Sequence, residues 1–327
     1  MTSKNDSMGG KTQKHVFPPT ASIRQACRET ETEMKLSQHK KTIYGIIGVL
    51  FIAGLLVASF FDLEISSALS GLSDAGGALS LSVPVFASVL EILGEWPAVI
   101  ISAAAFYLVT SVLAEKHKKA AVWIRIFSVL PVTCLMAYGC GKTAEYLYGS
   151  LTARMYLAVA LLSAALALAA LLCVSLIPET ARKKLFYPAA YTLAAAILIL
   201  VTVSALKVVW GRIRLRELVA AGSLDGFAPW YRPNFFSGSH SFPSGHTAHN
   251  TLTLMLPMWL HGKGTKYNTA LYIACSAFIL LMAISRLAAG AHYLSDILFG
   301  FLIAFVITEL MKYRYDKNHS SIQAEIP

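Results

Sequence analysis

The stretches Phe242-Pro-Ser-Gly-His246 and Ser285-Arg-Leu-Ala-Ala-Gly-Ala-His-Tyr-Leu-Ser-Asp296 decide how this chain is expected to fold. They bring together two histidines, an arginine, serine hydroxyls, glycines and a carboxylate, and both stretches lie beside long apolar segments. Such polar groups are costly next to lipid unless they are paired or face water. Their grouping therefore predicts apolar helices that cross a membrane, with a phosphate-handling site at one membrane face.

The composition agrees with a membrane protein. Of 327 residues, 56% are hydrophobic and 14% are charged, whereas about 25% of the residues of an average soluble domain are charged. The formal net charge of +10 raises the possibility of a nucleic-acid-binding protein. We reject that class because Lys and Arg occur mainly in short links between apolar runs and form no single basic face.

A helix needs about 20 mostly apolar residues to span a bilayer. The chain therefore predicts an all-α, polytopic transmembrane helix bundle of about eight spans, or six or seven if short spans are misassigned. The interrupted apolar stretch Ser82–Leu93 is expected at the membrane interface or in a re-entrant loop. The eight candidate spans are Ile43–Phe61, Pro97–Ala114, Val122–Gly139, Met155–Ile177, Pro188–Trp210, Thr247–His261, Ala270–Ser285 and Ile297–Met311.

The remaining segments carry few signals. Residues 1–40 are polar without an apolar core, which predicts a disordered tail and argues against a secretory signal. Five cysteines are scattered without a CxxC pair, so we expect neither a structural disulfide nor a metal site. They are Cys27, Cys134, Cys140, Cys173 and Cys275.

The distribution of Lys and Arg predicts the orientation. If the N-terminal tail is cytoplasmic, the links on that side hold 14 Lys and Arg near the membrane, and the opposite links hold seven. Cytoplasmic loops normally carry the excess of positive charge. Both opening stretches are therefore expected on the external face.

Lys207 and Arg214 follow the fifth candidate span. Taken alone, such residues are more often anchors that reach the lipid headgroups. Here Arg214 stands between Arg212 and Arg216 on the side where positive charge is normally avoided. Guanidinium and ammonium groups suit phosphate oxygens, so we expect Lys207 and Arg214 to bind an anion.

The segment Pro243–His246 leads directly into an apolar run. Its plain interpretation is a turn followed by the first residues of a helix. In the functional interpretation, Gly245 lets backbone N–H groups approach an anion, Ser244 donates a hydrogen bond and His246 transfers a proton. His240 and His249 are expected to be surface or packing residues.

Arg286, His292 and Asp296 form the third group. His292 and Asp296 are four residues apart, so on one helix they share a face. A carboxylate can hold an imidazole in one tautomer and leave its other nitrogen free to attack. Alone, Asp296 could simply favour a helix N-terminus and Arg286 could be an interfacial anchor. The coincidence of all three favours a catalytic site.

These three groups resemble the signature motifs of the type 2 phosphatidic acid phosphatase family, which vanadium haloperoxidases and glucose-6-phosphatases share. Lys207, six residues and Arg214 are similar to the first motif, with Leu215 in place of its proline. Pro243–His246 and the set Ser285, Arg286, His292 and Asp296 match the second and third motifs in full. The resemblance covers roughly residues 188–311.

The resemblance implies a metal-independent phosphohydrolase without a cofactor. His292 would attack phosphorus and form a phosphohistidine, with Asp296 orienting its ring. His246 would protonate the leaving group and later deprotonate water. Lys207, Arg214, Arg286, Ser244 and the Gly245 amide would hold the phosphate oxygens. The expected substrate is phosphatidic acid, phosphatidylglycerol phosphate or polyprenyl diphosphate, handled at the outer face of a bacterial cytoplasmic membrane.

Two other functions stay open at this point. One is phosphate transfer from a lipid diphosphate to another acceptor, which would use the same phosphohistidine. The other is a transporter or scaffold that binds phosphorylated lipid without cleaving it. The expected organisation is a cytoplasmic tail over 1–40, transmembrane helices over 41–187, a catalytic core over 188–311 and a cytoplasmic C-terminal tail over 312–327.

Overall fold

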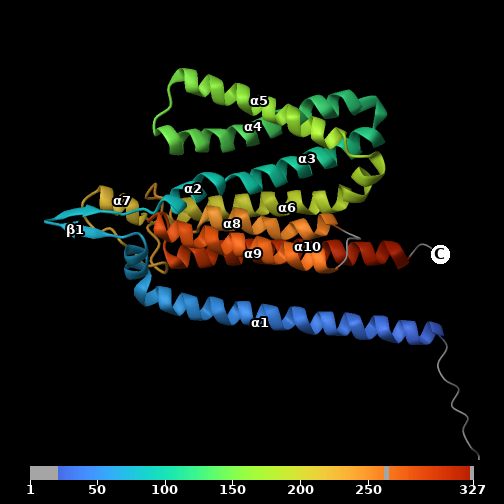
Figure 1. Ribbon diagram of the computed structural model, residues 1–327, viewed down its shortest axis with the longest axis horizontal. Coiled ribbons are helices and arrows are strands. Elements are labelled where there is room, and N and C mark those ends of the chain that lie inside the picture. The colour runs from blue at the N-terminus through green and yellow to red at the C-terminus, as the bar shows by residue number, and fades with distance from the viewer. Residues whose placement is uncertain (1–20, 261–264, 325–327) are drawn as a thin grey trace, which may run out of the picture. The chain divides into compact units, whose positions relative to one another are not determined.

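The computed structural model describes residues 21–260 and 265–324, and this part of the chain is almost entirely helical (Figure 1). One small antiparallel hairpin interrupts the helices. The elements are, in chain order, α1 (Ala21–Leu69), β1 (Ser73–Ala75), β2 (Ala78–Ser80), α2 (Val85–Leu93), α3 (Trp96–Lys116), the 3₁₀ helix η1 (Lys118–Ala120), α4 (Ala121–Tyr148), α5 (Ala153–Ser175), α6 (Glu179–Trp210), α7 (Leu215–Ala220), α8 (Gly245–Thr251), the 3₁₀ helix η2 (Leu252–Leu260), α9 (Thr265–Ala288) and α10 (Leu294–Ala324).

The chain divides into two units, residues 1–52 and 53–327. In the first unit, α1 begins at Ala21, so residues 21–40 are helical and the expectation of a disordered tail is wrong for them. This segment is polar but rich in Arg, Gln, Glu, Met and Lys, which have high helix propensity. Residues 1–20 of the predicted tail lie outside the described residues, and its cytoplasmic location stays a prediction.

Seven helices in the described part of the chain are long and apolar enough to cross a membrane. Large apolar side chains are exposed along them, as expected for surfaces that contact lipid. The predicted class, an all-α polytopic bundle, is therefore confirmed. The seven segments are Lys41–Leu69, Val85–Lys116, Lys118–Tyr148, Ala153–Ser175, Glu179–Ala220, Lys266–Ala288 and Leu294–Asn318. The stretch Ser82–Leu93 largely forms α2, which leads into α3.

The eighth predicted span, Thr247–His261, is not a long α-helix. It consists of the seven-residue α8 followed by the nine-residue 3₁₀ helix η2. A 3₁₀ helix rises about 2.0 Å per residue and an α-helix about 1.5 Å, so together they extend roughly 29 Å. Hydropathy predicted an apolar segment here, but it could not predict the 3₁₀ geometry.

The second unit is held together by helix packing around α3 and α6. Figure 1 shows α4 and α5 on the side of α3 that faces away from α9 and α10. Tyr107 of α3 is fully buried between these layers, and its hydroxyl donates a 3.0 Å hydrogen bond to the carbonyl of Ala167 in α5. This bond satisfies a polar group that would otherwise be costly inside the bundle.

Small residues allow close approach where α10 meets α8 and α1. A Cβ on Gly300 would lie 2.5 Å from the carbonyl oxygen of Ser244, so only glycine fits at this point of α10. Gly54 of α1 similarly packs against Leu298. The kink at Phe61 (φ −126°, ψ 18°) interrupts α1 one residue before Asp62, which is buried.

We expect Gly300→Ala to lower the midpoint of thermal unfolding in detergent, because the new methyl group must push α10 away from the backbone at Ser244. Overpacking of this kind costs about 1–3 kcal/mol. Gly141→Ala is the matched control, since a Cβ there meets no atom within 4 Å and alanine favours a helix. Equal unfolding midpoints for Gly300→Ala and the wild type would contradict the predicted close packing.

Candidate active site

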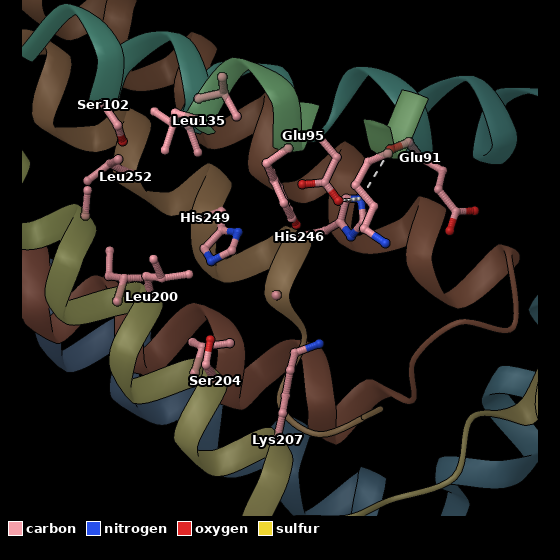
Figure 2. Close-up of a pocket in the computed structure, with 18 of the residues that line it drawn as sticks. Glu91, Glu95, Ser102, Leu135, Leu200, Ser204, Lys207, His246, His249 and Leu252 are labelled. Carbon is pink, nitrogen blue, oxygen red and sulfur yellow. Dashed lines mark hydrogen bonds and ion pairs between the residues drawn. The ribbon is translucent and has the colours of Figure 1, made fainter. Parts of the chain in front are cut away.

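A cavity of about 780 Å³ lies between α3, α4, α6 and α8 (Figure 2). Its charged end contains residues from all three sequence groups, which are far apart in the chain. Six of the eight predicted site residues line it: Lys207, Arg214, Gly245, His246, Arg286 and His292. The structure therefore brings both predicted catalytic histidines to one cavity.

The loop after α6 is turned by a glycine. Gly211 adopts a left-handed conformation (φ 61°) as the C-cap of α6, and a Cβ there would lie 2.1 Å from the carbonyl oxygen of Asn234. The turn places Arg212 and Arg214 next to the cavity. Leu215 then begins α7 and is fully buried. Proline is common at the first position of a helix, but this position does not require it. Because Gly211 makes the turn and Leu215 begins α7, leucine can stand in place of the motif's proline.

Lys207 and Arg214 are held by the same backbone group. The Lys207 ammonium donates to the carbonyl of His240 at 3.1 Å, and the Arg214 guanidinium donates to the same carbonyl at 3.4 Å. Arg214 also pairs with Glu217 at 3.2 Å. Gly245 keeps space open beside the lysine, because a Cβ there would lie 3.5 Å from Lys207 Nζ.

Arg286 is fully buried and fixed from α2. Its guanidinium donates to the carbonyl of Ala87 at 2.7 Å and lies 3.3 Å from Glu91 Oε1. The same carboxylate oxygen accepts a 3.0 Å hydrogen bond from Arg216. Glu91 thus orients two guanidinium groups that line the cavity.

His292 and Asp296 lie side by side as their spacing predicted. His292 Nδ1 is 3.7 Å from Asp296 Oδ2, which is longer than a hydrogen bond, and this nitrogen has no hydrogen-bond partner among the described residues. Oδ2 instead accepts hydrogen bonds from the Ser241 hydroxyl (2.6 Å) and the Tyr293 amide (2.9 Å). Burial lowers the pKa of His292 to about 4, against the opposing effect of Asp296.

Arg212 holds the other side of Asp296. Its guanidinium donates to Asp296 Oδ1 at 2.7 Å and to Asp62 Oδ2 at 2.8 Å, and all three side chains are buried. It also donates to the hydroxyl of Ser295 at 2.8 Å. The ring of Tyr293 lies 4.1 Å from the guanidinium carbon. Arg212 is therefore a positioning group for Asp296 and is fully engaged without an anion.

His246 faces the junction between α2 and α3 through one ring nitrogen. Its Nε2 lies 3.2 Å from Glu95 Oε1 and 3.2 Å from the carbonyl oxygen of Glu91, as the dashed lines in Figure 2 show. Burial, together with the positive charge of Arg286, holds the pKa of His246 well below its usual value. Glu95 is the acidic side chain placed to stabilise the protonated ring.

Two predicted residues do not line the cavity. Asp296 lies beside His292 and outside the cavity lining, a place that is compatible with the predicted orienting carboxylate. Ser244 is fully buried as the N-cap of α8, where its hydroxyl accepts from the amide of Thr247 at 3.4 Å and shares a 3.0 Å hydrogen bond with the Thr247 hydroxyl. The structure therefore shows Ser244 as a helix cap, and its contact with phosphate stays a prediction.

The two additional histidines differ from each other. His240 contributes its backbone carbonyl to Lys207 and Arg214. His249 was expected to be a surface or packing residue, yet it lines the cavity one helical turn after His246.

Sequence reasoning missed four charged residues that build the site: Asp62, Glu91, Glu95 and Arg212. Three of them precede residue 188, so the site is not confined to the predicted catalytic core. Acidic residues inside or beside apolar spans are rare and usually functional, and this signal could have identified Asp62, Glu91 and Glu95. Arg212 was noted for its charge, but its two carboxylate partners, Asp296 and Asp62, are 84 and 150 residues away along the chain.

Comparisons with known proteins give a consistent result. Residues 165–320 match the model of the PAP2 superfamily. A segment of the chain is 28% identical over 108 residues to phosphatidylglycerophosphatase B of Bacillus subtilis, covering 32% of this chain and 53% of that protein. The chain is also 32% identical over 94 residues to phosphatidylglycerophosphatase B of Haemophilus influenzae, covering 27% of this chain and 39% of that protein.

The chain thus spans about half, or less, of the length of these two curated relatives. No solved structure matches the chain significantly. The matched family is the one that the three motifs resemble, and its segment includes all eight predicted site residues. Residues 165–320 of this chain therefore belong to the PAP2 superfamily.

Proposed function

We propose that this integral-membrane protein is a phosphatase that hydrolyses a lipid phosphate or diphosphate through a phosphohistidine, without a metal ion. The observation that carries the proposal is the convergence of His246 and His292 on one cavity beside Lys207, Arg214 and Arg286. Three cations suit the charge of a phosphoryl group: Lys207 in α6, Arg214 at the N-cap of α7 and Arg286 in α9. Of the two imidazoles, one suits attack on phosphorus and the other suits proton transfer.

In the first step, His292 attacks phosphorus. Because Nδ1 faces Asp296, Nε2 is the nitrogen that forms the new N–P bond. The bond between phosphorus and the leaving oxygen breaks, and the proton carried by His246 passes to that oxygen. The Asp296 carboxylate stabilises the positive charge that develops on the His292 ring.

In the second step, His246 accepts a proton from water, and the water oxygen attacks phosphorus. The N–P bond breaks, inorganic phosphate leaves and His292 returns to its neutral form. The Glu95 carboxylate, 3.2 Å from His246, stabilises this imidazole whenever it carries the proton. His246 thus alternates between acid and base within one turnover.

The cations stabilise the transferring phosphoryl group. Lys207 and Arg214 approach from the end of α6, and Arg286 approaches from the end of α9 with its guanidinium preoriented by Glu91. Preorganised charges in a site shielded from water act most strongly on the transition state. The amide of Gly245 lies at the start of α8, where backbone N–H groups favour an anion.

The substrate candidates are phosphatidic acid, phosphatidylglycerol phosphate and polyprenyl diphosphate. The names of the two relatives favour phosphatidylglycerol phosphate among them. The excess of Lys and Arg on the opposite side favours a site at the outer face of a bacterial cytoplasmic membrane.

Purified protein in detergent is expected to release inorganic phosphate from at least one of these lipids in the presence of EDTA. His292→Ala should reduce release to background, and His246→Ala should reduce it about 10²–10⁴-fold. Asn268→Ala on α9, which no motif includes, is the control for purification and folding. Activity that survives His292→Ala would refute the nucleophile, and activity lost with EDTA would refute the metal-free mechanism.

The pH profile of kcat/KM should have its maximum between about pH 4 and 6. Because burial lowers the pKa of His292 to about 4, its ring is neutral and nucleophilic above that pH. Below that pH the ring is protonated and cannot attack phosphorus, so kcat/KM should fall. The pKa of His246 is also held low, so at pH 7 its ring is neutral until it takes up the proton that the substrate brings as the phosphate monoanion, whose second pKa is about 6. A profile that rises from pH 6 to 9 would contradict this assignment.

Asp62→Ala should destabilise the fold by about 3–5 kcal/mol, because it leaves the buried Arg212 partly unpaired. It should also lower kcat more than it raises KM, since Arg212 positions Asp296 and does not line the cavity. Asp225→Ala, at an exposed position, is the matched control and should change stability by less than about 0.5 kcal/mol. Unfolding curves and kinetics that are equal for both variants would refute the role of Asp62.

A further inference from the structure

The cavity continues from the charged site into the apolar interior of the bundle. Figure 2 shows Lys207, Glu95 and His246 at one end and Leu135, Leu200 and Leu252 at the other. Its volume of about 780 Å³ lies within the range typical of small-molecule sites, which are mostly apolar with a few polar groups. The cavity is thus much deeper than a phosphoryl group requires.

The wall from α6 has one polar end. Lys207, Val203, Leu200, Ala196 and Leu193 all line the cavity. Their spacing of three or four residues places them on one helix face. From Lys207 to Leu193 this face extends about 21 Å at 1.5 Å per residue. The helix therefore presents a cation at the site and an apolar strip below it.

The wall from α4 repeats this pattern. Its lining residues begin with Glu145 and Lys142 near the site, pass Tyr138 and continue with Leu135 and Pro131. This face is also about 21 Å long. The family match begins at residue 165, so α4 lies outside the matched segment.

The wall from α3 is attached to α4 near the site. It presents Glu95, Ser102 and Phe106 to the cavity, with Phe106 farthest from the charged end. The indole N–H of Trp96 donates a 3.2 Å hydrogen bond to the hydroxyl of Thr143 in α4. This bond between the two helices fixes the width of the cavity beside the site.

We propose that this cavity binds the hydrocarbon chain of the substrate, with α4 as its outer wall and Phe106 and Pro131 at its floor. The inference rests on the proposed phosphatase function and specifies the substrate as an amphiphile with one chain lying in this cavity. Three separate helices each combine polar residues at the site with apolar residues along the same face, which is the pattern that a phosphate attached to a hydrocarbon chain requires. Apolar cavities of this kind take up hydrocarbon in preference to water.

The test uses water-soluble alkyl phosphates of increasing chain length, with isoprenyl phosphates of matched length as a second series. In the wild type, kcat/KM should rise up to about fourfold per added methylene, the equivalent of about 0.8 kcal/mol for each buried CH₂, and then level off when the chain reaches the floor. If kcat/KM rises farther in the alkyl series, the natural chain is straight. If it rises farther in the isoprenyl series, the natural chain is branched.

Two pairs of variants test the walls. Leu135→Trp should remove most of the gain with chain length, whereas Leu130→Trp, on an exposed part of α4 outside the cavity, should retain it. Phe106→Ala should move the plateau to longer chains, and Phe127→Ala, also exposed on α4, should leave it in place. Chain-length profiles that are equal within each pair would overturn the inference.

A binding measurement separates this inference from the proposed function. Alkyl phosphonates cannot be hydrolysed, and their binding should raise the midpoint of thermal unfolding more as the chain lengthens. If no lipid phosphate is hydrolysed but the phosphonates still stabilise the wild type and Leu130→Trp more than Leu135→Trp, the phosphatase proposal fails and the chain site stands. If hydrolysis is found and stabilisation is independent of chain length and of Leu135, the chain site fails.

Discussion

The buried guanidinium of Arg212 joins two carboxylates that come from opposite ends of the chain, Asp62 in α1 and Asp296 in α10. Removing three charged groups from water is costly, and their mutual pairing and hydrogen bonds offset that cost only if the geometry is maintained. The position of Asp296 in turn limits where His292 can lie. The architecture of the site therefore depends on this ionic network more than on any contact with substrate.

A second set of paired charges performs the same task on the other side of the cavity. Glu91 pairs with Arg216 and Arg286, and Glu95 lies next to His246. The two acidic residues come from the segment around the start of α3, whereas their partners come from α7, α8 and α9. His292 and His246 thus each have a carboxylate beside them, Asp296 in α10 and Glu95 at the N-cap of α3.

Much of this organisation could be predicted from the sequence, because apolar length identifies helices and motif spacing identifies His246, Arg286, His292 and Asp296. The helical segment 21–40 could not be distinguished from a disordered tail by its polarity. The capping role of Ser244 could not be separated from a contact with phosphate, because a hydroxyl at a helix start suits both a cap and an anion. The partners of Arg212 depend on tertiary packing, which pattern and propensity do not specify.

The kink at Phe61 has a consequence for any attempt to isolate the segment that matches the family, residues 165–320. It directs Asp62 into the interior, so the first long helix supplies a counter-charge to a segment that begins more than a hundred residues later. A fragment that starts at residue 165 would contain every motif residue and yet leave an arginine unneutralised in its interior. The segment that matches the family is therefore shorter than the segment needed to fold around this site, which must include Asp62.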